Sequence, residues 1–333
     1  MVRTLKIAAI QMEATPAPTA QRLARAADLV AEAAAAGGEL VVLPELFNAG
    51  YAYIDDLYDA VENLDGTTVQ WMKGQAAQHH IHLAGTLLIR EGDEVYNSAL
   101  LFAPDGQMWR YDKRYPFGWE RAFFRERKDQ ITVAETSLGR LGMMICWDSA
   151  HPDLWRDYAG KVDAMVIPSC PPDLTKSSVV FPDGQKFQVE LPSSHFADQD
   201  IHDQTAWLGV PAVHSSGGGV FKSPMPAPKI SVLGFLFSRP ASWGRMRQAG
   251  SARLEAPYQH HTQIINAKGE VVGRVTVDGD GFTIAEVELP DSSHQPDQPQ
   301  PKMRTPDIVF RLNDVVMPFA VRSIYRKKTK NRS

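Results

Sequence analysis

This sequence contains very little cysteine and no long hydrophobic runs. Only 2 of its 333 residues are cysteine, which excludes a disulfide framework, and a chain of this length can bury a sizeable core without one. The rarity of cysteine favours a reducing compartment, and we expect a cytoplasmic protein. No uninterrupted apolar run reaches the roughly 18 residues that a membrane span needs, and we expect no membrane partner. Lys6 and Gln11 interrupt the first apolar stretch, which is therefore a poor signal peptide.

An excess of charge of one sign is also missing. The 35 basic and 39 acidic side chains give a formal net charge of -4, which is too small to favour a nucleic-acid partner. Histidines occur at positions 79–80, 82 and 260–261, but their spacing gives no convincing ligand set, and there is no Cys/His motif at zinc spacing. The glycines at 217–219 lack the Lys-Ser/Thr that follows a phosphate loop. We therefore expect no metal site.

Apolar patterns predict strands that alternate with helices over most of the chain. LKIAAIQMEA is typical of a buried strand, residues 19–36 have apolar side chains at helical spacing, and ELVVLPELF predicts the next strand. Gly37 and Gly38 fit the end of that helix. The alternation continues to about residue 210, hairpins are mixed in, and the pattern favours an α/β sandwich. Residues 187–208 are predicted to be mostly helical.

Two segments do not follow this alternation. Residues 222–255 are rich in Pro, Gly and Ser around the apolar ISVLGFLF, and residues 291–333 end in the basic RSIYRKKTKNRS. We interpret the first segment as an insertion in one domain of residues 1–290, and the second as a C-terminal extension. The insertion is predicted to be a lid or an oligomer contact, because its apolar run is short for a membrane element. The basic end is predicted to be solvated and frayed.

Residues that can perform chemistry follow three of the predicted strands. Glu45 follows ELVVLP, Lys113 follows MWRYD and Cys146 ends GRLGMMIC, while Glu120 lies within the aromatic RYPFGWERAFF. Ligand sites of open α/β sheets gather at such strand ends. A thiolate can attack a polarised carbon, a carboxylate can take the thiol proton, and an ammonium can stabilise the oxyanion. A second carboxylate can keep the lysine protonated, and the lysine is expected to lower the pKa of the cysteine.

Each of these residues also has a structural interpretation when it is taken alone. Cys146 alone fits a small buried core residue. Glu45 alone fits a turn cap, and Lys113 alone fits a solvated charge on a hairpin. Glu120 could instead belong, with Glu126 and nearby arginines, to a surface charge cluster. The catalytic interpretation therefore depends on the whole set and not on any single residue.

Three segments resemble a known family. LPELF, YDKRYPFGWERAFF and GRLGMMICWDSAHPD are similar, in sequence and in order, to the signature regions of the nitrilase superfamily of carbon-nitrogen hydrolases. The resemblance implies a four-layer α-β-β-α sandwich, commonly dimerised through its helices, that needs no metal or organic cofactor. It implies Glu45 as the general base, Lys113 as the catalytic lysine, Cys146 as the nucleophile and Glu120 as the second glutamate. A homodimer or larger homo-oligomer is therefore expected.

The resemblance also accounts for the place of the thiol. At the junction between strand and turn, the sulfur of Cys146 is expected to face solvent and substrate. The backbone N–H of Trp147 is then free to help Lys113 bind the oxyanion. Acyl transfer to sulfur releases ammonia or an amine, and water activated by Glu45 hydrolyses the thioester.

The bond that is cleaved is less well defined. The CWD motif at 146–148 is similar to amidase-type members, whereas the segment from Lys113 to Glu120 is similar to nitrilases. We favour a small or aromatic-bearing amide as the substrate over a nitrile that is converted to a carboxylic acid and ammonia. Acyl transfer to another amine, and a catalytically silent binding or scaffold protein with the same fold, stay open. Residues 195–213 lack the Arg-Ala-x-Glu-Asn helix that the family often carries.

Overall fold

The computed structural model describes residues 3–129, 131–189, 196–236, 240–259, 261–290 and 295–330. The strands of its first sheet are β1 (Arg3–Glu13), β2 (Leu40–Val42), β3 (His82–Glu91), β4 (Glu94–Phe102), β5 (Met108–Asp112), β12 (Gly217–Gly218) and β17 (Gly281–Leu289). Their order is β12-β1-β2-β3-β4-β5, with β17 paired antiparallel to β1. Strands β1, β2 and β3 are parallel, whereas β3, β4 and β5 form antiparallel pairs in chain order.

A second sheet packs against the first. Its strands are β6 (Val133–Thr136), β7 (Gly139–Met143), β8 (Ala164–Pro168), β11 (Ala212–Ser215), β15 (Gln263–Ile265) and β16 (Val271–Arg274). They are ordered β16-β15-β11-β8-β7-β6, and the central strands β7, β8 and β11 are parallel. Parallel strands that are covered on both faces read as nearly continuous apolar runs, which explains why GRLGMMIC and VDAMVIPSC show little alternation.

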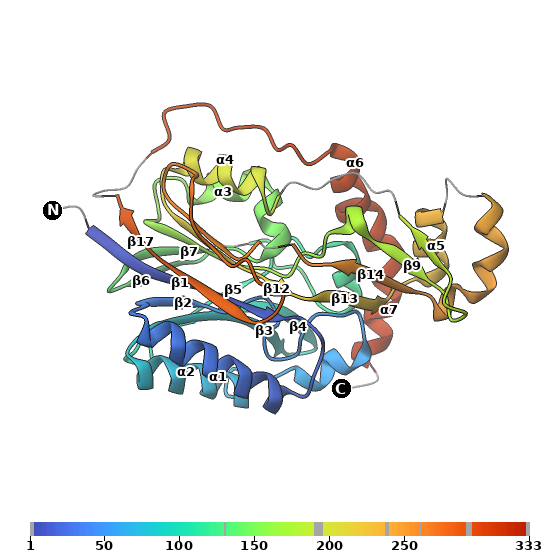
Figure 1. Ribbon diagram of the computed structural model, residues 1–333, viewed down its shortest axis with the longest axis horizontal. Helices are drawn as coiled ribbons and strands as arrows, with labels where there is room; N and C mark the ends of the chain where they lie inside the picture. The colour runs from blue at the N-terminus through green and yellow to red at the C-terminus, as the bar shows by residue number, and fades with distance from the viewer. Residues whose placement is uncertain are drawn as a thin grey trace.

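Helices cover the outer face of each sheet, as Figure 1 shows. They are α1 (Thr19–Ala35) and α2 (Thr67–His79) on the first sheet, and α3 (Pro152–Tyr158) and α4 (Gln199–Leu208) on the second. Along β1, Ile7 and Ala9 belong to the core between the sheets, whereas Ala8 and Ile10 belong to the core under α1. This period of two follows from the pleat of a strand. The expected four-layer α-β-β-α sandwich is confirmed.

The insertion does more than form a loose appendage. Two of its strands, β13 (Val220–Pro224) and β14 (Arg253–Pro257), form a third sheet with β9 (Ser178–Val180) and β10 (Lys186–Gln188), in the order β10-β9-β14-β13. Between them lie α5 (Pro228–Leu236) and the 3-10 segment η5 (Pro240–Ser251), at the right of Figure 1. Two further 3-10 segments are η1 (Asp55–Ala60) and η4 (Leu174–Lys176).

The prediction for residues 187–208 is partly wrong. Phe187 lies in strand β10, opposite Val179, and the helix begins only at Gln199; residues 190–195 lie outside the described part of the chain. Pairing with β9 places Phe187 against Phe181, with ring centroids 5.7 Å apart. Such a tertiary contact overrides local helix propensity.

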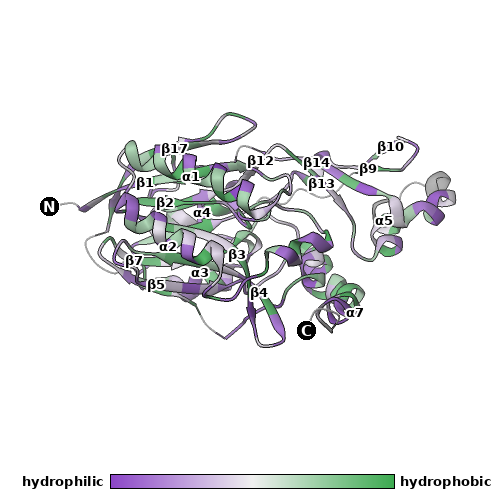
Figure 2. Cartoon of the chain, turned by 90° about the horizontal axis from the view of Figure 1, so that it is seen from below, coloured by the Kyte–Doolittle hydropathy of each residue, from purple (hydrophilic) through white to green (hydrophobic). Residues whose placement is uncertain are grey.

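The prediction of a frayed basic end is also wrong for the residues that the structure describes. The chain closes with α6 (Asp307–Phe310), the π-helical segment η6 (Arg311–Val316) and α7 (Met317–Lys330). On α7, Val321 and Tyr325 are buried, four residues apart. In Figure 2 this helix carries both hydrophilic and hydrophobic colours, as an amphipathic helix should. Among the described helices, none is both long and apolar enough to cross a membrane.

Candidate active site

Glu45 lies in the turn after β2, where the two sheets meet. Its backbone N–H donates to the carbonyl of Ser169, just beyond β8 of the second sheet, at 3.2 Å. The next residue, Leu46, has a φ of 50° and donates its N–H to the Thr86 hydroxyl at 2.8 Å. Left-handed backbone is unfavourable for a residue with a branched side chain, and these bonds hold the turn. The carboxylate of Glu45 is completely buried.

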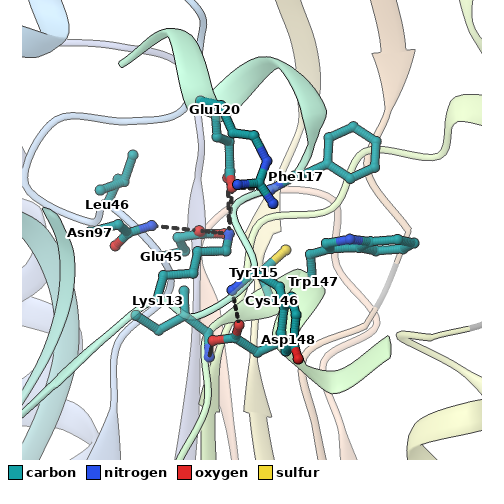
Figure 3. Close-up of polar contacts among 12 residues, drawn as sticks. Glu45, Leu46, Asn97, Lys113, Tyr115, Phe117, Glu120, Cys146, Trp147 and Asp148 are labelled. Atoms are coloured by element: carbon teal, nitrogen blue, oxygen red, sulfur yellow. Dashed lines mark hydrogen bonds and ion pairs between the residues drawn. The ribbon is translucent and has the colours of Figure 1, made fainter. Parts of the chain in front are cut away.

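Lys113 follows β5 and reaches the same point from another strand. Its backbone N–H donates to the Asn97 carbonyl on β4 at 2.9 Å, which fixes where the side chain starts. The ammonium Nζ lies 2.7 Å from Glu45 Oε1 and 2.8 Å from Glu120 Oε2, as Figure 3 shows. The lysine side chain is fully buried. One cation is thus held between two carboxylates inside the protein.

Glu120 lies in the 3-10 segment η2 (Gly118–Ala122). Its Oε2 accepts the Phe117 N–H at 2.7 Å, and its Oε1 accepts the Tyr51 hydroxyl at 2.5 Å. The surface charge cluster considered above forms without it, because Arg121 pairs with Glu126 instead. Glu120 therefore faces inward and holds Lys113.

Cys146 is the first residue of the 3-10 segment η3 (Cys146–Ala150), directly beyond β7. Its φ of 49° is left-handed, a strained conformation that is common at functional sites. The first hydrogen bond of this segment is made by the Asp148 N–H to the Ile145 carbonyl at 3.0 Å. The N–H of Trp147 precedes that first donor, as helix N-termini leave their first N–H groups unpaired. In Figure 3, Cys146 and Trp147 lie beside the Glu45–Lys113–Glu120 group.

The electrostatics of the group are dominated by burial. Burial raises the pKa of Glu45 to about 7, although the adjacent Lys113 opposes this shift. Burial disfavours the charge on Lys113, but Glu120 and Glu45 outweigh it and raise its pKa well above the ordinary value. Lys113 is therefore charged at neutral pH, whereas Glu45 gains and loses its proton near neutral pH.

One expectation about the cysteine is wrong: the thiol does not face solvent, because Cys146 is only 4% exposed. Lys113 does lower the pKa of the thiol as expected, but this effect does not decide the net direction. Burial raises the pKa well above the ordinary value, Glu45 adds to the increase, and the opposing effect of Lys113 is smaller. Cys146 is thus a thiol at rest, and it would have to lose its proton before it could act as a nucleophile.

Several residues that position the group were not identified from the sequence. The Asn97 amide donates to Glu45 Oε1 at 2.8 Å. Asp148 accepts the Tyr111 hydroxyl at 2.8 Å, the Tyr115 N–H at 2.7 Å and the Ile145 N–H at 3.0 Å. An asparagine inside the apolar strand VYNSALLF was the one available signal, because buried polar groups need partners.

The second oxygen of the Glu45 carboxylate has a different environment. Glu45 Oε2 is buried and accepts no N–H or O–H from the residues that the structure describes; a hydrogen bond with the Cys146 thiol opposes the increase in the pKa of Glu45 that burial causes. The thiol of Cys146 is close enough for Glu45, Lys113 and Glu120 each to shift its pKa. The site therefore brings together a buried carboxylate, a buried thiol and a fixed cation. No set of three or more His, Cys, Asp or Glu side chains within the described ranges is arranged to hold a metal ion.

Comparison of the sequence with known protein families shows which class of protein this chain belongs to. The carbon-nitrogen hydrolase family matches residues 6–184, more than half of the 333 residues. The chain therefore belongs to this family.

Particular relatives point to two activities. The chain is 29% identical over 160 residues to a nitrilase of Pyrococcus abyssi, covering 47% of this chain and 61% of that protein. It is 30% identical over 168 residues to an omega-amidase of Mus musculus, covering 47% of this chain and 59% of that protein. The matched segment thus spans less than two thirds of either relative.

Solved structures share the fold over most of the chain. Nit3 of Saccharomyces cerevisiae, a nitrilase-superfamily member, superposes with a TM-score of 0.63 at 22% identity, covering 86% of this chain and 90% of that one. An amidase of Nesterenkonia sp. AN1, with acrylamide added to its active-site cysteine, gives a TM-score of 0.62 at 17% identity, covering 87% and 94%. At these identities the likeness concerns the fold.

Proposed function

We propose that the protein hydrolyses the carbon–nitrogen bond of a small amide through a thioester on Cys146. One observation carries this proposal: the Glu45 carboxylate, whose Oε2 accepts no N–H or O–H from the described residues, is buried together with the Cys146 thiol and the Lys113 ammonium. Family membership and the acrylamide adduct on the cysteine of the Nesterenkonia amidase support the assignment of the nucleophile.

The proposed reaction begins with proton transfer. Glu45 takes the proton of Cys146 while the sulfur attacks the carbonyl carbon, and the ammonium of Lys113 and the N–H of Trp147 stabilise the oxyanion. Collapse of the tetrahedral intermediate breaks the C–N bond, and Glu45 returns the proton to the leaving ammonia or amine. Water then attacks the thioester, Glu45 takes its proton, and the carboxylic acid leaves as the thiol is restored.

Glu120 has a different role in this proposal. Lys113 lies between two carboxylates, and protonation or movement of Glu45 during turnover leaves Glu120 still paired with the ammonium at 2.8 Å. The lysine can therefore keep its charge and its position while Glu45 exchanges protons. Tyr51 and the Phe117 N–H hold Glu120 in turn.

A cluster of aromatic rings near Glu120, the aromatic wall formed by Tyr53, Trp119 and Phe221, favours an apolar acyl group. Tyr53 contacts Trp119 and Phe221 edge-on, with ring centroids 5.6 and 5.8 Å apart, next to the tyrosine that binds Glu120. The insertion touches this wall twice: the Trp119 indole donates to Ser231 at 3.0 Å, and Ser223 accepts the Tyr53 N–H at 2.8 Å. We therefore propose that the insertion covers the substrate.

A nitrile is the second candidate, and the name of the Pyrococcus relative favours it. With a nitrile, sulfur forms a thioimidate that takes up water before ammonia leaves. Asp148 does not discriminate between the two, because backbone and tyrosine donors already occupy its carboxylate. The discriminating measurement is ammonia release from short aliphatic and aromatic amides and from the nitriles of the same acids.

Two variants test the role of the thiol. Cys146→Ala is expected to abolish ammonia release while leaving the circular dichroism spectrum and the unfolding midpoint close to wild type. Cys170→Ala is the matched control, because Cys170 is the other buried thiol, and it should retain turnover. Normal ammonia release by Cys146→Ala would refute the proposed mechanism.

A further inference from the structure

The C-terminal extension reaches the turn that carries the candidate nucleophile. Its π-helical segment η6 packs on η2, so closely that a Cβ atom on Gly118 would lie 2.7 Å from the Asn313 amide oxygen. From η6, Asp314 Oδ1 accepts the indole N–H of Trp147 at 3.2 Å. π-helical turns are rare and occur frequently at functional sites. Residues 167 positions apart are thus joined beside Cys146.

Asp314 also contacts a histidine that holds the same tryptophan. Asp314 Oδ2 lies 3.1 Å from His151 Nε2, and His151 Nδ1 lies 2.9 Å from the Trp147 carbonyl oxygen. Both neighbours of the imidazole can act as acceptors for a ring N–H of His151. The ring is fixed by stacking on Tyr115, with centroids 3.6 Å apart and planes 3° apart.

These contacts fix one residue at two points. The indole N–H of Trp147 is bound by Asp314, and its carbonyl oxygen by His151, which Asp314 also orients. The guanidinium of Arg121 lies 3.7 Å from Asp314 Oδ1, the same oxygen that accepts the indole N–H. Asp314, in the C-terminal extension, therefore contacts Trp147 near the start of η3, His151 directly after η3, and Arg121, the residue that follows Glu120.

The position of Trp147 matters for the residue before it. Cys146 is held at a φ of 49°, and a strained backbone persists only when its surroundings over-determine it. Rotation about the N–Cα bond of Cys146 would relieve that strain, but it would also move Trp147 and carry away the N–H that precedes the first bonded donor of η3. Anchoring the indole and the carbonyl of Trp147 opposes this movement.

We propose that Asp314 is a positioning residue for the active site: through the Trp147 indole and His151 it holds the Cys146 turn in its reactive conformation. The C-terminal extension is thereby part of the active site. The kinetic consequence rests on the proposed hydrolase function, whereas the conformational consequence does not.

Asp314→Asn tests this proposal with little change of shape. The matched control is Asp307→Asn, the same substitution on an exposed residue of the same extension. Hydrogen–deuterium exchange of peptides spanning residues 145–151 reports the conformation without substrate. Steady-state ammonia release from the amide that is hydrolysed fastest reports the kinetics.

We expect Asp314→Asn to speed exchange over residues 145–151 at least fivefold. It should lower kcat at least tenfold with KM within threefold of wild type, and Asp307→Asn should change neither. Exchange and kcat equal to those of the Asp307 control would overturn the proposal, as would faster exchange spread over the whole chain. If the wild-type protein releases no ammonia from any amide or nitrile, the proposed function fails, while the exchange measurement still decides the role of Asp314.

Discussion

Replacing Lys113 by methionine is the sharpest test of how this site is balanced. The ammonium lies 2.7 Å from Glu45 and 2.8 Å from Glu120, and all three side chains are at most 1% exposed. Methionine fills similar space without charge, and both carboxylates then stay buried without their cation. Removing one partner of a buried ion pair costs about 3–5 kcal/mol, a large part of the roughly 5–15 kcal/mol by which a folded protein is stable.

The loss of stability should depend on pH with a defined sign. A glutamate in an unfolded chain has a pKa of about 4.3, whereas the folded protein raises that of Glu45 to about 7 even with Lys113 present. Folding therefore favours the protonated form. In Lys113→Met the lowering effect of the cation is gone, so the deficit relative to wild type is smallest near pH 4 and grows as pH rises beyond 7.

Urea unfolding followed by far-ultraviolet circular dichroism at pH 5 and pH 8 measures this difference. We expect a deficit of about 3–5 kcal/mol at pH 8 and a clearly smaller one at pH 5. The triple variant Glu45→Gln/Lys113→Met/Glu120→Gln carries no charge at these positions and should recover most of the loss. A deficit equal at both pH values, or one below about 1 kcal/mol at pH 8, would refute the reasoning.

Three further outcomes follow from the same structure. The acidic limb of the kcat/KM profile should be centred near pH 7, because Glu45 has a pKa of about 7 and must be ionised to take the thiol proton; a limb below pH 5.5 would contradict its role as the base. Tyr51→Phe removes the hydroxyl that donates to the Glu120 carboxylate and should cost about 1–3 kcal/mol in urea unfolding, whereas unchanged stability would show that the bond is not needed. Val321→Ala, at a fully buried position of α7, should cost about 2 kcal/mol. Phe319→Ala on the same helix, where the side chain is 79% exposed, should stay within about 0.5 kcal/mol; equal losses in the two variants would contradict the packing of α7.

The sandwich could be predicted because its elements have strong local patterns. The period of helix α1 and the glycine pair after it mark where the helix ends: α1 stops at Ala35, and Gly37 has a φ of 93°. The candidate site residues could be found because Glu45, Lys113 and Cys146 each follow a strand. Whether a residue directly follows a strand can be predicted from the local sequence pattern.

Other features depend on contacts that no local pattern reveals. The basic end forms a helix because two of its residues pack on the rest of the protein. The guanidinium carbon of Arg125 lies 4.1 Å from the centroid of the Tyr325 ring, and Val321 is buried. The high pKa of the thiol comes from burial, which outweighs the neighbouring lysine. Asp314 lies in an extension without a clear period, and only folding brings it to Trp147.

The residues of the candidate active site come from different sheets, with Glu45 and Lys113 beyond strands of the first and Cys146 beyond a strand of the second. Their separation is therefore set by the apolar layer between the sheets, in which Ile7 and Val42 meet Met143 and Val166. The rate of turnover should therefore be sensitive to the distance between the two sheets. Low concentrations of denaturant that loosen the apolar layer should abolish activity, while the far-ultraviolet ellipticity of the strands and helices is still that of the folded protein.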